Sequence, residues 1–269
     1  MFLLGKEVAE NIKNKVKNEI ESLKRKPSLC ILLNKNDSSS VSYANSIIKT
    51  ASYVGINAFI KEVNNYEEDI DYINKSDEID ACLITRPLLD NVDEQKVISL
   101  LDSNKDVDAI SPANIGKILH GDESLTPNTA KAIIEIIEYH NIALSGKKVL
   151  VIGRSISVGK PVAMLLLNRN ATVTIAHSRT KNLDDELSKY DIVVVAIGKP
   201  HLIDGDKMKE GAIVIVAGIH YLEDGIKGDV KPSDKLSLIS KVPGGVGPIT
   251  SACLMQNVLS CYRRNKNDK

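Results

Sequence analysis

The stretch that most constrains the fold is residues 144–180, LSGKKVLVIGRSISVGKPVAMLLLNRNATVTIAHSRT. An apolar run at 149–152 stops at Gly153, and after a second glycine come a helical apolar pattern and a β-branched run at 171–175. This order predicts a strand, a glycine loop, a helix and a parallel strand, which form one βαβ unit. Pro161 suits the first turn of the helix, where its missing N–H costs nothing. We therefore expect a helix N-terminus with unpaired N–H groups at the carboxyl edge of a parallel sheet, where anionic pyrophosphates bind.

The glycine spacing and the end of the second strand together indicate the type of nucleotide. The spacing is Gly-x5-Gly rather than G-x-G-x-x-G, so the loop alone also fits a turn whose glycines only allow tight packing. An NAD site usually carries Asp or Glu at the end of the second strand, whereas this chain has Ser178 and Arg179. Hydroxyl and guanidinium groups suit a 2′-phosphate, and Arg154 adds a positive charge in the loop. We therefore expect NADP rather than NAD.

Composition and charge exclude several classes of protein. The 269 residues are enough for two domains with separate cores. Lys plus Arg and Asp plus Glu both total 35, so no net charge draws the chain to nucleic acid or an anionic membrane. The four cysteines contain no C-x-x-C pair, which argues against a metal site or a disulfide framework. The apolar start at 1–4 is interrupted by Lys6 and Glu7, too early for a signal peptide. We therefore expect a soluble, cytoplasmic protein without a metal.

Two α/β domains are predicted from the order of the remaining segments. The first 85 residues predict alternating helices and strands: helix 5–25, strand 28–33, helix 41–54, strand 56–63, helix 66–73 and strand 79–85. Beyond them we expect a helix at 129–139, further buried strands at 192–197 and 212–216, and a last helix at 250–262 that packs back on the first domain. The predicted domains are 1–127 plus 250–269, and a Rossmann-like nucleotide-binding domain at 128–249.

Seven segments, in order along the chain, resemble the bifunctional methylenetetrahydrofolate dehydrogenase/cyclohydrolase family. They are Ser42-Tyr43, KDVD (105–108), TP (126–127), GRSISVGKP (153–161), NATVTIAHSRT (170–180), AIGKP (196–200) and VPGGVGPIT (242–250). The resemblance implies two α/β domains with the active site in the cleft between them, NADP as cofactor, a folate substrate and a homodimer. The implied reactions are oxidation of 5,10-methylenetetrahydrofolate to the methenyl form and its hydrolysis to 10-formyltetrahydrofolate.

The resemblance also assigns cofactor contacts. By position, Gly153, Arg154, Ser155 and Ser178 correspond to residues that contact NADP, and Ile219 corresponds to a residue that lines the nicotinamide pocket. In the implied dehydrogenase step a hydride moves from the one-carbon bridge of the folate to the nicotinamide. The folate nitrogens stabilise the cation that forms, so the enzyme mainly supplies proximity and orientation.

The folate side is assigned in the same way. Tyr43 resembles the residue that stacks on the folate ring, and Asp108 resembles the carboxylate that holds the pterin edge; these two are our catalytic candidates. Pro243, Gly244 and Gly247 belong to the loop that walls the same pocket in the family.

Several positions depart from the family pattern. The family places Lys one helical turn after this Tyr, whereas the chain has Ile47, and the Gln that partners the Lys aligns with Thr85. Hydrolysis of the methenyl cation needs a group that changes protonation near neutral pH, which Ile cannot do. Neighbouring Arg86 stays protonated and is a poor base. Val216 replaces an acid. We therefore predict a working dehydrogenase with weak or absent cyclohydrolase activity.

Two other function classes fit the sequence. One is a different two-domain NADP oxidoreductase that acts on a small polyol acid and needs a Lys–Asp catalytic pair, which we cannot place. The other is a non-catalytic homologue that binds folate or nucleotide and regulates a partner. His177 and His220 lie at strand ends, and we expect both to be hydrogen-bonded loop histidines rather than catalytic groups.

Overall fold

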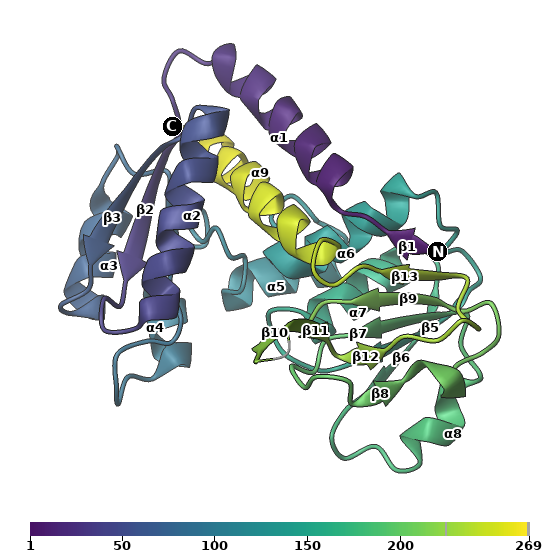
Figure 1. Cartoon of the computed structure of the whole chain (residues 1–269). Coiled ribbons are helices and arrows are strands. Elements are labelled where there is room, and N and C mark those ends of the chain that lie inside the picture. The colour runs from purple at the N-terminus through teal and green to yellow at the C-terminus, as the bar shows by residue number, and fades with distance from the viewer. Residues whose placement is uncertain (224, 268–269) are drawn as a thin grey trace. The chain divides into compact units, whose positions relative to one another are not determined.

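The computed structural model describes residues 1–223 and 225–267, and the chain divides into two compact units. Met1–Glu10 and Pro127–Thr250 form the six-stranded unit, and Asn11–Thr126 with the chain from Ser251 onward form the three-stranded unit (Figure 1). Both have parallel sheets covered by helices, so the predicted two-domain α/β fold is confirmed.

The three-stranded unit has the strand order β3-β2-β4, with all strands parallel. The strands are β2 (Ser28–Leu33), β3 (Asn57–Glu62) and β4 (Ala81–Ile84). Because alternate side chains of a strand point to opposite faces, Leu29, Ile31 and Leu33 join one core cluster, whereas Cys30 and Leu32 join another.

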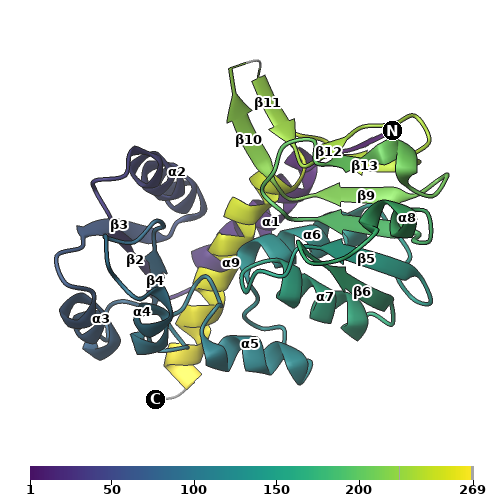
Figure 2. The ribbon, with the colours of Figure 1, turned by 90° about the horizontal axis from the view of Figure 1, so that it is seen from below.

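Helices cover both faces of that sheet. On the first face lie residues of α1 (Lys6–Glu21), α2 (Ser38–Val54) and α9 (Val246–Asn267). On the second lie α3 (Tyr66–Lys75) and α4 (Glu94–Leu100), and Figure 2 shows α2 on the side opposite to both. Residues 254–262 of α9 are part of the first cluster, which confirms that the last helix packs on this unit.

Local signals set the ends of α2, the helix that carries Tyr43. The helix starts three residues earlier than predicted, because the Asp37 carboxylate caps it by accepting from the backbone N–H of Ser40 at 2.6 Å. At its C-terminus Gly55 adopts φ +91°, a left-handed conformation that glycine reaches without strain.

The six-stranded unit has the strand order β1-β13-β9-β7-β5-β6, and every pairing is parallel. The strands are β1 (Phe2–Leu3), β13 (Leu238–Ser240), β9 (Ile213–Val216), β7 (Ile192–Val195), β5 (Lys148–Ile152) and β6 (Thr172–Ala176). The pairing of β1 with β13 joins residues 1–10 to this compact unit, whereas we predicted them within the domain formed by 1–127 plus 250–269.

Two layers cover this sheet as well. The helices α6 (Asn128–Tyr139) and α7 (Gly159–Asn168) lie on one face, where α7 contacts β5 and β6. On the other face α8 (Leu183–Leu187) and the 3₁₀ turn η1 (Gly205–Lys207) border the cluster that contains Leu150 and Ile152. The short strands β8 (Ile203–Asp204) and β12 (Val230–Lys231) pair with each other, and the antiparallel strands β10 (Ile219–Leu222) and β11 (Gly225–Gly228) project from the sheet (Figure 2).

The three-stranded unit also contains α5 (Pro112–Leu119). Within residues 1–223 and 225–267, no helix is long and apolar enough to cross a membrane.

Candidate functional site

The loop after β5 is shaped by two glycines that no other residue could replace without displacing backbone. A Cβ on Gly153, whose φ is +127°, would lie 2.3 Å from the carbonyl oxygen of Ala196. A Cβ on Gly159 would lie 2.2 Å from the carbonyl oxygen of Gly153. The loop therefore folds back on itself and onto the end of β7, and leaves its outer side for a ligand, as a phosphate-binding loop requires.

The start of α7 differs from the prediction. The Ser155 hydroxyl accepts from the N–H groups of Val158 (3.2 Å) and Gly159 (3.3 Å), and the Ser155 carbonyl accepts from Lys160 (3.0 Å). Pro161 has no N–H to offer. The expected unpaired N–H groups of the first turn are thus already engaged by the loop. A pyrophosphate at this edge would contact the loop and be attracted by the positive end of the helix dipole. It would not accept hydrogen bonds from the first turn of α7.

The turn after β6 places the predicted phosphate contacts at the same edge. The backbone N–H of His177 donates to the Thr180 hydroxyl at 2.9 Å, and the N–H of Thr180 donates to the carbonyl of His177 at 2.8 Å. The backbone N–H of Arg179 donates to His177 Nδ1 at 3.1 Å. These bonds build a tight turn in which Ser178 and Arg179 are exposed, and Arg154 in the glycine loop is also exposed. The side chains expected for a 2′-phosphate are therefore open to a ligand.

The structure also brings Ile219, predicted for the nicotinamide pocket, into contact with Gly247, predicted for the loop that walls the folate pocket. A Cβ on Gly247 would lie 3.1 Å from Cδ1 of Ile219, so this glycine packs directly on the isoleucine. Gly244 has φ +107°, and its carbonyl accepts from the N–H of Gly5 at 2.8 Å. Pro243, whose peptide bond is cis, is exposed in the same loop.

A carboxylate that sequence reasoning missed lies behind this edge. Asp229 is completely buried, and its oxygens accept from the N–H groups of Ile197 (3.0 Å), Gly198 (3.3 Å) and Lys199 (3.0 Å). His220 Nε2 lies 2.7 Å from Oδ1 of the same carboxylate. His220 is hydrogen-bonded, as we expected, but it lies in the strand β10 and not in a loop. Asp229 had no sequence signal of its own, because it is a lone acid whose partners lie some thirty residues earlier along the chain.

In the three-stranded unit, Arg86 forms an ion pair with Asp108, and the charges of both residues affect the nearby hydroxyl of Tyr43. Asp108 Oδ2 lies 3.0 Å from Arg86 Nη1, and Arg86 Nε lies 2.5 Å from a carboxylate oxygen of Glu94. Partial burial raises the pKa of the Tyr43 hydroxyl; the charge of Asp108 raises it further, and Arg86 partly offsets this. Burial lowers the pKa of Arg86, but Asp108 and Glu94 outweigh this and raise it on balance. The cluster therefore offers a neutral aromatic ring, a carboxylate and a permanent cation.

The other two charged residues of the KDVD segment serve the fold. The buried Lys105 donates to three backbone carbonyls, those of Ile73, Asn74 and Ser76. Burial lowers the pKa of this lysine. Asp106 accepts from the N–H of Ser111 and the amide of Asn114. They fix the chain on either side of Val107 and so support the position of Asp108.

Ile47 and Thr85, the two predicted departures from the family pattern that bear on hydrolysis, are both inside the protein. Ile47 has no exposed surface and belongs to the core cluster that contains Leu29, Ile31 and Leu83. The buried Thr85 hydroxyl accepts from the N–H of Asn34 at 3.2 Å and donates to the carbonyl of Leu32 at 3.1 Å. Neither side chain titrates near neutral pH, so neither can move a proton for hydrolysis.

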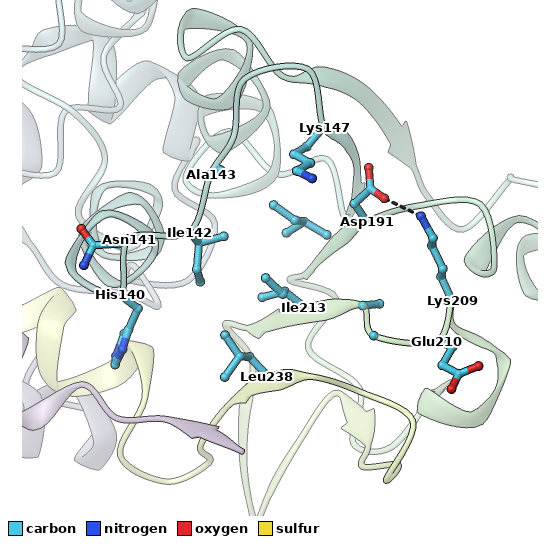
Figure 3. Close-up of a pocket in the computed structure, with 13 residues that line it drawn as sticks. His140, Asn141, Ile142, Ala143, Lys147, Asp191, Lys209, Glu210, Ile213 and Leu238 are labelled. Atoms are coloured by element: carbon cyan, nitrogen blue, oxygen red, sulfur yellow. Dashed lines mark hydrogen bonds and ion pairs between the residues drawn. The ribbon is translucent and has the colours of Figure 1, made fainter.

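A cavity of about 430 Å³ in the six-stranded unit is not the candidate site. It opens at the amino ends of β7, β9 and β13, where Ile213 and Leu238 face it (Figure 3). Lys209 at its rim is already paired with Asp191 at 2.6 Å. Ligands of parallel α/β sheets bind at the opposite, carboxyl edge. Among the residues that the structure describes, no three His, Cys, Asp or Glu side chains form a metal-binding group.

Comparisons with known proteins cover both units. Residues 3–108 match the catalytic domain, and residues 127–266 the NAD(P)-binding domain, of the tetrahydrofolate dehydrogenase/cyclohydrolase family. The chain is 43% identical over 274 residues to the bifunctional protein FolD of Acetivibrio thermocellus, covering 97% of this chain and 96% of that protein. It is 40% identical over 273 residues to FolD of Bacillus subtilis, with 97% and 96% covered.

Solved structures agree with these relatives. A bifunctional 5,10-methylenetetrahydrofolate dehydrogenase/cyclohydrolase from Thermoplasma acidophilum superposes with a TM-score of 0.93 at 33% identity, over 99% of this chain and 100% of that one. The Trypanosoma brucei enzyme, solved with NADP cofactor and an inhibitor, gives 0.91 at 30% identity, over 98% and 97%.

Proposed function

This chain belongs to the tetrahydrofolate dehydrogenase/cyclohydrolase family, and we propose that it is an NADP-dependent 5,10-methylenetetrahydrofolate dehydrogenase with little or no cyclohydrolase activity. One observation carries the proposal. The groups for cofactor and folate are present and accessible, whereas position 47 is a buried isoleucine in the hydrophobic core.

The residues at the carboxyl edge of the six-stranded sheet fit a dinucleotide phosphate. A side chain at position 153 would collide with the backbone of the loop, so glycine is required there. The Ser155 hydroxyl fixes the rest of the loop by accepting from the N–H of Val158. Arg154 and Ser178 are exposed close to the ends of adjacent paired strands, where a 2′-phosphate could receive charge-assisted hydrogen bonds. When NADP is bound, its nicotinamide accepts the hydride. Ile219 and Gly247 would form one wall of the pocket for that ring.

On the folate side, Tyr43 would stack on the pterin and Asp108 would accept hydrogen bonds from its edge. A carboxylate has about four lone-pair sites, so Asp108 can bind the pterin while Arg86 stays on one oxygen. These residues bind and orient the substrate, which is what hydride transfer requires of them, since the folate nitrogens stabilise the cation that forms.

Cyclohydrolase activity makes a different demand. Water attack on the methenyl bridge needs a proton acceptor and donor near neutral pH, worth about 10²–10⁴-fold in rate. Ile47 and Thr85 supply none, and the raised pKa of Arg86 makes that guanidinium an even poorer base. The two activities that the family combines would therefore be separated in this protein.

Assembly and location follow from the family resemblance and the sequence. We propose a homodimer in the cytoplasm that does not bind nucleic acid; the four cysteines are buried and form no disulfide, which suits a reducing compartment. Neither the site formed by the described residues nor the relatives favours a regulatory homologue or an oxidoreductase for another substrate.

A two-part spectrophotometric assay tests the proposal. NADP reduction is followed with 5,10-methylenetetrahydrofolate as substrate, and decay of added methenyltetrahydrofolate is then compared with its uncatalysed rate. We expect saturable NADP reduction and decay at the background rate. A protein that binds both ligands but reduces no NADP would be the regulatory homologue instead.

A further inference from the structure

The buried Asp229 joins three segments of the six-stranded unit that end at the same edge of the sheet. Its carboxylate accepts from three consecutive backbone N–H groups at 197–199, in the loop after β7. Its fourth partner is His220 on β10, the strand that follows β9. A carboxylate offers about four lone-pair sites, and here four donors use them. Because the carboxylate only accepts, His220 Nε2 must carry the proton in this bond.

The backbone at Gly218 packs so closely on this carboxylate that no side chain fits at position 218. A Cβ on Gly218 would lie 2.3 Å from both oxygens of Asp229, so only glycine fits between the end of β9 and this carboxylate. The loop that Asp229 holds starts beside the glycine loop, since the carbonyl of Ala196 is the atom that a Cβ on Gly153 would strike. The contacts therefore run from the proposed phosphate loop to Asp229 and His220.

The same series of contacts continues to Ile219 and Gly247, the proposed wall of the nicotinamide pocket. His220 directly follows Ile219, whose Cδ1 is in contact range of Gly247. The hairpin β10–β11 projects from the sheet, and the bond from His220 to Asp229 ties it down at its base (Figure 2). The side chain of His220 is 16% exposed and that of Asp229 is fully buried, so water competes little for this bond.

From these contacts we propose that His220 and Asp229 are positioning residues for hydride transfer. The pair holds Ile219 in register with the loop at 196–199, and so fixes the wall against which the nicotinamide would lie. This inference rests on the proposed dehydrogenase function. It assigns the pair no contact with substrate and no proton transfer.

A positioning role and a purely structural role predict different kinetics. If the pair only stabilised the fold, its loss would lower the unfolding temperature and leave the turnover of folded enzyme unchanged. If it positions the ring, kcat must fall while NADP affinity stays near its native value, because the proposed phosphate contacts lie on the loops after β5 and β6.

The experiment compares His220→Ala with His220→Gln in the full chain. The glutamine amide can reach the place of the imidazole Nε2 and donate to Asp229, whereas alanine cannot. His201→Asn is the control, because His201 is an exposed histidine of the same unit with φ +50°, a conformation that asparagine tolerates. The readouts are kcat, KM for NADP, the calorimetric Kd of NADP, and amide hydrogen exchange at 197–199.

We expect His220→Ala to lower kcat about 10- to 100-fold, in line with the effect of small misplacements on transfer reactions, and to speed amide exchange at 197–199. The Kd of NADP should change less than about threefold, and His220→Gln should recover most of kcat. An unchanged kcat in His220→Ala, or a loss that His220→Gln does not repair, would overturn the inference.

Two further outcomes are separable. If His220→Ala does not fold, the shorter polar variant His220→Asn takes its place, with the same expected loss because its amide does not reach Asp229. If the native protein reduces no NADP, the proposed function itself fails. If the native enzyme reduces NADP and the His220 variants have the same kcat, only the positioning role is refuted.

Discussion

Ile47→Lys introduces the residue that we expect in the family at this position, and the structure predicts that it will destabilise the fold without restoring hydrolysis. Ile47 has no exposed surface, and its cluster is formed by aliphatic side chains such as Leu29, Ile31 and Leu83. A fully buried lysine has its pKa lowered by up to 3–5 units, which corresponds to about 4–7 kcal/mol. That is comparable with the whole stability of a domain, about 5–15 kcal/mol.

The assay measures stability and activity on the same preparations. Urea unfolding of native protein, Ile47→Lys and the volume-conserving control Ile47→Met gives the free energies of unfolding. We expect a loss of several kcal/mol for lysine, and less than about 1.5 kcal/mol for methionine. Methenyl decay should stay at the uncatalysed rate in all three proteins, while NADP reduction should survive in the methionine variant.

Two results would refute this reasoning. If Ile47→Lys lost less than about 1 kcal/mol, its amine would have reached water along its alkyl stem, and burial at this position would not exclude a lysine. If Ile47→Lys also accelerated methenyl decay, a lysine at position 47 would by itself be sufficient for hydrolysis. Native decay well above background would refute the absence of cyclohydrolase activity and direct attention to Arg86.

Three further predictions concern the cofactor, the folate and the helix that carries Tyr43. Arg154→Ala and Arg179→Ala should each weaken NADP binding by about 1.5–3 kcal/mol and leave NAD binding unchanged in calorimetric titrations; equal use of both cofactors by the native enzyme would contradict this. Asp108→Ala should weaken folate binding by about 1–3 kcal/mol with NADP affinity unchanged, and a parallel loss of NADP binding would point to a role in the fold instead. The pKa of Asp37 is lowered by its bonds from Ser39 and Ser40, so its stabilisation of α2 is present above the usual carboxyl pKa and is lost as pH falls through the lowered value. Acid unfolding of Asp37→Ala should lack this contribution, and identical acid profiles for variant and native protein would exclude it.

Strands with a continuous apolar run were predictable from the sequence, because burial on both faces leaves a strong local pattern. The run at 28–33 is β2 with the same bounds, and the run at 149–152 is β5 with one residue more. The strands β1 and β13 were not predicted, because two or three residues carry no readable period. Their pairing joins sequence positions more than 230 residues apart, so no local pattern could show that residues 1–10 contact the six-stranded sheet.

The candidate site was predictable where a motif carries its own geometry. Gly153 and Gly159 are required by close backbone contacts, and the turn with Ser178 and Arg179 follows a strand with clear β-branched character. The capping of α7 by Ser155 was missed, since a serine four residues before a glycine has no such signal. Asp229 was missed for a similar reason, because what defines it is its tertiary contacts with the loop after β7.

Position 47 shows the limit of helical spacing as an argument. Residues four apart on a helix lie on one face, so Tyr43 and Ile47 were expected to share a pocket. In the structure Tyr43 is 39% exposed, whereas Ile47 is at 0%, because the buried face of α2 includes position 47 and only borders Tyr43. That face is formed by Ser40, Ala44, Ile47, Ala51 and Val54. A lysine here has to extend from the core to the substrate, whereas isoleucine adds apolar burial. Chemistry and packing therefore compete for this one position, and since hydride transfer does not need the lysine, the packing can improve while the dehydrogenase remains intact.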